Sequence, residues 1–192
     1  MKLVVAEFVT VDGVAQAPGA PDEDEERGFE HGGWSVDHID DHIRFNTELF
    51  QTVDAFLIGR GTYDAWVDYW PTVTDETDAI AKALNTKPKY VASSTLEDPS
   101  WAGTTVVRDV PTEVAELKAK PGRPILVVAS LKLVQILTAE ALVDEYQLWI
   151  HPVAVGGVGK RLFEDGNPLT KLRLVDSRTT GSGLVILTYA RA

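Results

Sequence analysis

The sequence predicts an α/β domain whose central sheet is mainly parallel and whose last two strands form an antiparallel hairpin. Short runs rich in Val, Ile and Leu alternate along the chain with helical patterns, which is typical of βαβ units. The final two runs are separated by Thr180–Gly183, whose sequence Thr-Gly-Ser-Gly is a hairpin signal. No internal repeat or linker divides the chain, so a single domain over residues 1–192 is expected.

The hydrophobic pattern places each element in order. Apolar or alternating runs predict strands at 2–10, 54–58, 90–93, 104–108, 125–129, 143–154, 171–178 and 183–190. Helical patterns lie over 36–53, after 58 to about 67, over 76–84, from Pro111 onwards and over 130–137. Between the first strand and the first helix, residues 15–33 form a long loop of the kind that often binds ligands or acts as a lid. Its acidic run at 22–26 is most simply interpreted as solvated and mobile.

Two helices carry more detailed expectations. Ser35 stands where an N-cap is expected for the first helix. The residues of that helix expected to share one face are Val36, Ile39, Ile43 and Phe50. The residues of the helix over 130–137 expected to point inward are Leu133, Ile136 and Leu137.

Composition excludes several classes of function. The net charge of -11 argues against nucleic acid and anionic membranes as partners, because both need a basic surface. A few local cations can still hold a small anionic ligand. The chain has no cysteine, which excludes disulfides, thiolate catalysis and Cys-ligated metals. The N-terminal apolar run is interrupted by Glu7 and is too short for a signal peptide, and no window resembles a membrane span, so we expect a soluble cytoplasmic protein.

A change from strand to helix pattern occurs at Gly59-Arg60-Gly61-Thr62. Ligands of α/β sheets bind beyond the carboxyl ends of the strands, where the free N–H groups of a helix attract anions. The two glycines would allow close approach of a ligand, Arg60 could pair with a phosphate, and Thr62 could bind a phosphate oxygen. The alternative is purely structural: Gly59 ends a strand, Thr62 caps a helix and Arg60 is solvated.

Two further strand ends favour the ligand hypothesis. The strand at 125–129 runs directly into a helix at Ser130, and the strand at 90–93 ends in Ser93-Ser94-Thr95. Helix N-termini at one sheet edge could hold a pyrophosphate, so we expect a dinucleotide site there. The sequence has neither the G-x-G-x-x-G fingerprint nor a P-loop.

Motifs spread over nearly the whole chain are similar to those of one family. They are Thr10–Val14, Gly33-Trp34, Ile58–Tyr63, Tyr69–Pro71, Lys89–Ser93, Leu142–Glu145, His151-Pro152 with Gly156–Gly159, Leu162-Phe163 and Gly183–Tyr189. In their order and spacing the chain resembles stand-alone relatives of the RibD C-terminal domain, the reductase half of bifunctional riboflavin-biosynthesis enzymes. The resemblance implies a dihydrofolate-reductase-like fold, NADPH as cofactor, a homodimer, and reduction of 5-amino-6-(5-phosphoribosylamino)uracil.

The resemblance also implies roles for individual residues. Gly59, Arg60 and Thr62 would lie against the cofactor phosphates, and Ser93, Ser94 and Thr95 near the adenosine 2′-phosphate. Ala129, Ser130, Leu131 and Lys132 would lie under the pyrophosphate. The Thr10–Val14 turn would line the nicotinamide and substrate side, with the Gly156–Gly159 loop nearby.

Two positions depart from the family pattern. Ser94 replaces the usual Arg, which weakens the case for the 2′-phosphate and leaves NADH as an alternative cofactor. Ala129 replaces the usual Gly, and its Cβ could obstruct the pyrophosphate.

Candidate catalytic and substrate residues are few. A reduction needs a proton donor, for which Asp12 and Asp37 are the candidates, although Asp12-Gly13 also suits a plain turn. Thr10, Asp12 and Trp34 are the candidate substrate contacts, and Trp34 could equally cover the core. His38 and His42 have the i, i+4 spacing of metal ligands, but the sequence His-Ile-Asp-Asp-His lacks the metalloprotease Glu, so no metal site is expected.

Two hypotheses of function therefore follow. The first is an NAD(P)H-dependent reductase of a small heterocyclic substrate. The second is a non-catalytic ligand-binding or oligomerising protein that kept the fold and lost the cofactor site, which Ala129 and Ser94 favour. A folate reductase proper is disfavoured, because the first helix lacks the expected acid in its pattern.

Overall fold

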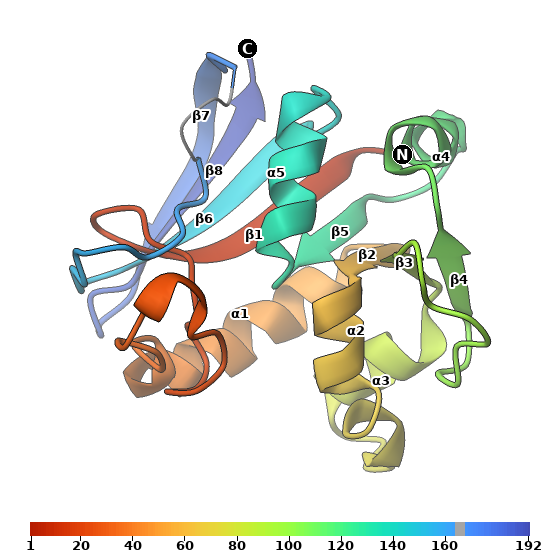
Figure 1. The fold of residues 1–192 in the computed structure, drawn as a ribbon, viewed down its shortest axis with the longest axis horizontal. Coiled ribbons are helices and arrows are strands. Elements are labelled where there is room, and N and C mark those ends of the chain that lie inside the picture. The colour runs from red at the N-terminus through yellow and green to blue at the C-terminus, as the bar shows by residue number, and fades with distance from the viewer. Residues whose placement is uncertain (164–167) are drawn as a thin grey trace.

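An eight-stranded sheet runs through the part of the chain that the structure, a computed structural model, describes, namely residues 1–163 and 168–192. The strands lie in the order β4-β3-β2-β5-β1-β6-β8-β7 (Figure 1). Their bounds are β1 Leu3–Thr10, β2 Ala55–Gly59, β3 Lys89–Ala92, β4 Thr104–Val107, β5 Ile125–Val128, β6 Glu145–His151, β7 Leu172–Thr179 and β8 Val185–Arg191. Pairing is parallel from β4 to β6 and antiparallel in β6-β8-β7, which confirms the predicted fold class.

Helices cover both faces of the sheet. They are α1 Ile39–Gln51, α2 Arg60–Trp66, α3 Ala79–Thr86, α4 Val110–Ala119 and α5 Leu131–Ala139, with short 3-10 turns at Glu26–Gly28, Val36–His38 and Trp70–Thr72. β5 shows the two layers, because Ile125 and Val127 pack with α4 and α5 whereas Leu126 and Val128 pack with α1, α2 and α3. A strand buried on both faces reads as a continuous apolar run, which is why β2 and β5 were predictable from the sequence.

The first helix differs from the sequence expectation. α1 begins at Ile39 after the 3-10 turn Val36–His38. Ser35 is the N-cap residue of that turn, but its hydroxyl donates to the Pro18 carbonyl and makes no capping hydrogen bond. Val36, Ile39 and Ile43 are exposed by 49%, 54% and 52%, so these three residues do not pack in the core, whereas Phe50 does. The buried residues of α1 are His42 and Phe50. Because His42 is polar, the hydrophobic pattern of the sequence does not reveal the buried face of this helix.

Two smaller predictions are also corrected. In α5, Leu133 and Leu137 are buried as expected, but Ile136 is 47% exposed. The strand expected at 143–154 is β6, shorter by two residues at its start and three at its end, and it lies between β1 and β8. The homodimer that the resemblance implies stays a prediction. None of the helices in the described residues is long and apolar enough to cross a membrane.

Candidate functional site

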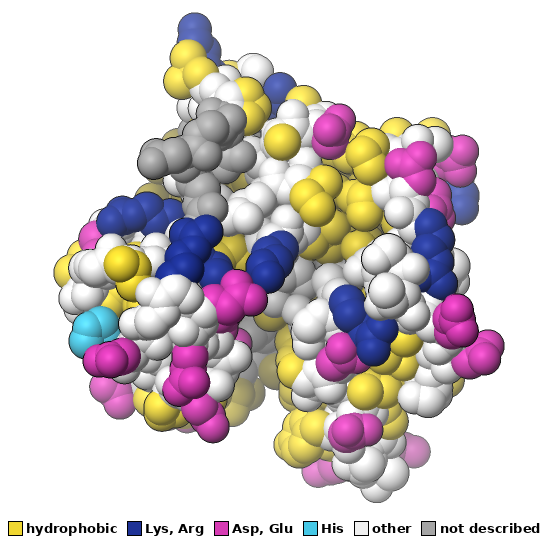
Figure 2. Space-filling model, viewed as in Figure 1, with side chains coloured by type: hydrophobic (Ala, Val, Ile, Leu, Met, Phe, Trp, Pro, Cys, Tyr) yellow, Lys and Arg dark blue, Asp and Glu magenta, His cyan; other side chains and the backbone are white. Residues whose placement is uncertain are grey.

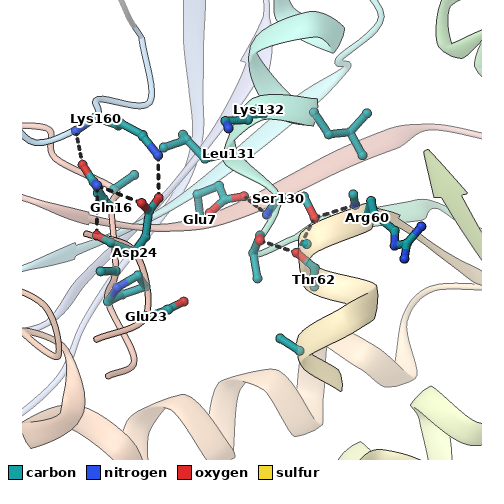
Figure 3. Close-up of a pocket in the computed structure, with 18 of the residues that line it drawn as sticks. Glu7, Gln16, Glu23, Asp24, Arg60, Thr62, Ser130, Leu131, Lys132 and Lys160 are labelled. Atoms are coloured by element: carbon teal, nitrogen blue, oxygen red, sulfur yellow. Dashed lines mark hydrogen bonds and ion pairs between the residues drawn. The ribbon is translucent and has the colours of Figure 1, made fainter. Parts of the chain in front are cut away.

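A cleft of about 580 Å³ opens at the carboxyl-terminal edge of the parallel strands. Its lining includes Glu7 of β1, the last residues of β2 and β3, which are Gly59 and Ala92, and Ala129 just after β5. Its walls come from the first turns of α2 and α5, from the segment after β1 and from Lys160 (Figures 2 and 3). The volume is typical of small-molecule sites, and the sheet edge is where ligands of α/β folds bind.

A chain of hydrogen bonds joins the two strand-to-helix junctions. The Gly59 N–H donates to Ser130 Oγ at 2.8 Å, and Ser130 Oγ lies 2.9 Å from Thr62 Oγ1, which donates to the Ala129 carbonyl at 2.5 Å. α2 begins at Arg60 with Gly59 as its N-cap residue, so the alternative that Thr62 caps this helix is wrong. Thr62 instead lies within α2 and fixes the distance between the two junctions, as the dashed lines in Figure 3 show.

A buried carboxyl group lies beside these junctions. Glu7 is 6% exposed, and its Oε1 accepts a 3.2 Å hydrogen bond from the Ser130 N–H. Burial raises the pKa of Glu7 to about 8, while the Ser130 N–H opposes the shift and the nearby Glu23 adds to it. Glu7 is therefore mainly a neutral acid at pH 7. The sequence interpretation used this residue only as a break in an apolar run, although a charged residue inside a buried strand is itself a signal of function.

The acidic segment, residues 22–26, lies beside the cleft, and Glu23, Asp24 and Glu26 belong to the cleft lining. Asp24 and Glu26 both lie 2.6 Å from Nζ of Lys160, which is 5% exposed, and Glu26 also pairs with Lys132 at 3.3 Å. The Gln16 side-chain amide donates to the backbone carbonyl oxygens of Asp24 and Glu26, at 3.0 Å each. Glu26 stays exposed, as expected for a solvated run, whereas Asp24 is half-buried against Lys160. The sequence did not indicate these ion pairs, because Lys160 is more than 130 residues away along the chain.

Comparison with known proteins identifies the family. Residues 1–186 match the model of the RibD C-terminal domain. The chain belongs to this family. It is 34% identical over 145 residues to the uncharacterized protein YyaP of Bacillus subtilis (strain 168), an alignment covering 74% of this chain and 77% of that protein.

Solved structures share the fold. A putative riboflavin biosynthesis protein from Shewanella sp. PV-4 superposes with a TM-score of 0.68 at 21% identity, covering 100% of this chain and 99% of that one. Dihydrofolate reductase from Enterococcus faecalis complexed with NADP(H) superposes with a TM-score of 0.61 at 14% identity, covering 99% and 96%. The fold of this RibD C-terminal domain is thus dihydrofolate-reductase-like, as the resemblance implied.

The departure at Ala129 has a measurable cost. Ala129 is exposed at the cleft with a φ of 51°, in the left-handed region that glycine adopts without strain. We expect Ala129→Gly to raise the free energy of unfolding by about 0.5–1 kcal/mol, because the strain relieved exceeds the extra entropy lost by glycine. Urea titration at pH 7 would measure it.

Ala141 provides a matched control for that substitution. It is exposed with a φ of 58° and lies outside the cleft, after α5. Ala141→Gly should give a similar gain in stability without any change in ligand binding, whereas Ala129→Gly should change both. A destabilised Ala129→Gly protein would contradict the assignment of strain to this position.

The Ser93–Thr95 strand end lies outside the cleft lining, which stops at Ala92. Ser93 Oγ accepts the Leu96 N–H at 3.0 Å, which shapes a turn. The guanidinium of Arg108, just after β4, donates to the Ser93 carbonyl at 2.7 Å and the Leu96 carbonyl at 2.5 Å. A cation therefore stands at this strand end although Ser94 replaces the family Arg, and the local sequence gave no sign of it.

The other predicted cofactor residues line the cleft. They are Gly59, Arg60, Thr62, Ala129, Ser130, Leu131 and Lys132. Arg60 is held by a 2.7 Å ion pair with Asp64 one turn along α2. Trp66 also lines the cleft, while Tyr63 is buried in the core.

The predicted catalytic and substrate residues lie elsewhere. Thr10 is buried and donates to Asp12 at 2.5 Å, and Asp12 accepts the Gly156 N–H at 2.8 Å, so these residues join the turn to the Gly156–Gly159 loop. The Thr10 hydrogen bond is the main reason that the pKa of Asp12 is lowered, which does not suit a proton donor. Trp34 donates to the Gln16 carbonyl at 2.8 Å, and Asp37 is exposed. None of these four lines the cleft; the neighbouring Ala15, Gln16 and Ala17 do.

The two histidines with i, i+4 spacing, His38 of the 3-10 turn and His42 of α1, have different partners. His38 bonds Ser182 at 3.0 Å, while His42 turns inward and meets His151, with 2.9 Å between the two Nε2 atoms. Within residues 1–163 and 168–192, no group of three or more His, Asp or Glu side chains is arranged to hold a metal ion. The sequence did not indicate the pairing of His42 with His151, because the two residues come from α1 and β6, which are far apart along the chain.

Proposed function

We propose that the protein is an NADPH-dependent reductase of a small heterocyclic substrate. The observation that carries this proposal is the open cleft at the carboxyl-terminal sheet edge, in a fold shared with a reductase complexed with NADP(H). Arg60 and Lys132 stand on opposite helices at this cleft and suit the charges of a pyrophosphate. The bound nicotinamide would supply a hydride, and the protein would supply position and electrostatics. By family resemblance, the specific candidate substrate is 5-amino-6-(5-phosphoribosylamino)uracil.

A titration with NADPH and NADH tests the proposal. Trp66 lines the cleft, so its fluorescence should change when a dinucleotide binds. We expect saturable binding of NADPH at micromolar concentration. No binding of either dinucleotide at millimolar concentration would favour the alternative, a protein that kept the fold and lost the cofactor site through Ala129.

The substitution Gly61→Ala distinguishes a steric effect on NADPH binding from an effect of lower protein stability. Gly61 lines the cleft, and a Cβ built on it meets nothing within 4 Å beyond its own helix backbone and chain neighbours, so the Cβ would extend into open space at the cleft. Gly61→Ala should stabilise α2 by about 0.5–1 kcal/mol through helix propensity. It should nevertheless weaken NADPH binding about tenfold through steric conflict.

Gly181, in the hairpin turn, is the control because its added Cβ also meets nothing within 4 Å. Gly181→Ala should leave NADPH binding unchanged. Undiminished binding by Gly61→Ala would place the ligand elsewhere.

Arg108 should decide the preference between the two dinucleotides. If the 2′-phosphate lies near Ser93, as the family implies, Arg108 is the cation that binds it. We expect Arg108→Ala to weaken NADPH binding about tenfold, the loss of one charge-assisted hydrogen bond, and to leave NADH binding unchanged. Arg173→Ala, which removes an exposed cation from β7, is the control and should change neither. Equal losses for both dinucleotides would contradict this role.

A further inference from the structure

Glu7 is a buried carboxyl group that lines the cleft and accepts a hydrogen bond from the Ser130 N–H. It projects from the middle of β1 into the cleft, between the acidic segment on one side and Ser130 on the other (Figure 3). Its Oε1 accepts the Ser130 N–H, and no described residue bonds its second oxygen, Oε2. An apolar side chain of similar volume would fill this position in the fold without the cost of burying a carboxyl group.

Among residues 1–163 and 168–192, no cation compensates Glu7. Within the described residues it makes no ion pair, and each nearby cation is already paired: Lys160 with Asp24 and Glu26, Lys132 with Glu26, and Arg60 with Asp64. The charged groups around this cleft are Glu23, Asp24 and Glu26 of the acidic segment, Arg60 of α2, Lys132 of α5 and Lys160 of the loop after β6. Burial, followed by the nearby Glu23 carboxylate, favours the neutral form of Glu7, whose proton then resides on the free Oε2.

We propose that Glu7 binds the ligand of this cleft as a neutral acid, donating a hydrogen bond from Oε2 to an uncharged carbonyl oxygen such as that of a nicotinamide carboxamide. This inference rests on the proposed function. Ligand binding is then linked to a proton: the dinucleotide binds protein in which Glu7 is protonated, and its own negative charge opposes ionisation of Glu7. Removal of that proton at higher pH weakens binding.

The pH dependence of dinucleotide binding tests this inference. The dissociation constants of NADH and NADPH are measured by tryptophan fluorescence from pH 6.5 to 9.5, a range that includes the Glu7 pKa of about 8. NADH is the main probe because it lacks the 2′-phosphate, whose own second pKa lies near 6. For the wild type we expect a constant value up to about pH 7.5 and then a rise approaching tenfold per pH unit.

Two variants distinguish the effect of the Glu7 proton on dinucleotide binding from the effect of the side chain's shape. Glu7→Gln keeps a hydrogen-bond donor, so it should bind with no pH dependence over the same range. Glu7→Leu keeps similar volume without a donor, and should bind about tenfold more weakly at pH 7. A wild-type curve that is flat, or a Glu7→Gln curve with the same slope as the wild type, would overturn the inference while leaving the proposed function intact. Absence of dinucleotide binding at every pH would overturn both.

A second measurement does not depend on any variant. Carbon-13 NMR of the labelled glutamate side chains follows each carboxyl group through its titration in the free wild-type protein. One resonance should titrate near pH 8, and addition of NADH should move its midpoint upward. If every glutamate titrates below pH 6, the inference is overturned.

Discussion

Replacement of Glu7 by Gln is expected to raise the free energy of unfolding by about 2–4 kcal/mol at pH 8. Burial raises the pKa of Glu7 from its ordinary value of 4.5 to about 8 in the folded protein. Each pKa unit corresponds to about 1.4 kcal/mol, and relaxation around a buried group reduces the total. Gln resembles the neutral form of Glu7 and cannot ionise, so it avoids this cost.

The direction of the pH dependence follows from proton counts. Between pH 4.5 and 8 the folded protein holds the Glu7 proton and the unfolded chain releases it. The contribution of neutral Glu7 to stability is therefore fully present below pH 4.5 and is lost as pH rises toward and through 8. The difference between Glu7→Gln and the wild type should grow with pH by at most about 1.4 kcal/mol per unit across that window.

Urea unfolding of both proteins at pH 5, 6.5 and 8 would measure this difference. Glu30→Gln is the matched control, because Glu30 is an exposed carboxylate outside the cleft and the exchange is chemically the same. Its effect should be small and independent of pH. A difference between Glu7→Gln and the wild type that stays constant from pH 5 to 8 would contradict the neutral state of Glu7. A stabilising change in a cleft residue would also indicate that stability was lost there for the sake of function.

The elements of the sheet were predictable because their information is local. β2 and β5 are continuous apolar runs buried on both faces, and the hairpin of β7 and β8 has its turn residues between two strand patterns. The two junctions at Gly59 and Ser130 were predictable for the same reason, since each follows a buried strand directly. The general position of the cleft then follows from the parallel order of the sheet.

The missed features depend on contacts between distant segments. Nothing near Asp24 indicates that Lys160 will neutralise it, and nothing near Ser94 indicates that Arg108 will stand beside it. Glu7 and His42 were missed for another reason: both are polar by type but buried, at 6% and 5% exposure, so a hydrophobic pattern reads them as breaks. One of the polar residues that such a pattern excludes from the core is Glu7, for which we propose a role in ligand binding.

The second large effect concerns the pair His42 and His151, which should make the protein lose stability in acid. The two rings are 5% and 0% exposed, and their Nε2 atoms are 2.9 Å apart. His151 Nδ1 lies 2.9 Å from the Trp149 carbonyl, which can only accept, so Nδ1 carries the proton and the Nε2 of His151 accepts from His42. A further proton on this Nε2 would set two N–H groups against each other inside the core.

Burial, followed by the nearby imidazoles, lowers the pKa of His42 from 6.5 to about 4. Burial lowers the pKa of His151 to a similar value of about 4. The unfolded chain therefore binds more protons than the folded protein between pH 6.5 and 4, and the stability present above pH 6.5 is lost as pH falls through that range. For two coupled rings we expect a total loss on the order of 3 kcal/mol.

Glu7 partly hides this loss in the wild type. From pH 4.5 to 6.5 the two effects oppose each other, because a fall in pH strengthens the contribution of Glu7 while it weakens that of the histidines. The test is therefore made in the Glu7→Gln background, by urea unfolding at pH 7, 5.5 and 4.5. Adding His42→Gln to that background keeps a donor for His151 and removes one titrating ring, so the acid loss should fall to about half.

His31 is the matched control, since it is exposed and stands outside the pair. Glu7→Gln with His31→Gln should lose as much stability in acid as Glu7→Gln alone. An acid loss that His42→Gln leaves unchanged would show that other groups, such as the ion pairs of Asp24 and Glu26 with Lys160, cause the acid sensitivity. If Glu7→Gln alone loses no stability between pH 7 and 4.5, the buried pair must accept protons as readily as the unfolded chain. The hydrogen-bonded arrangement of the two rings would then have to open in acid.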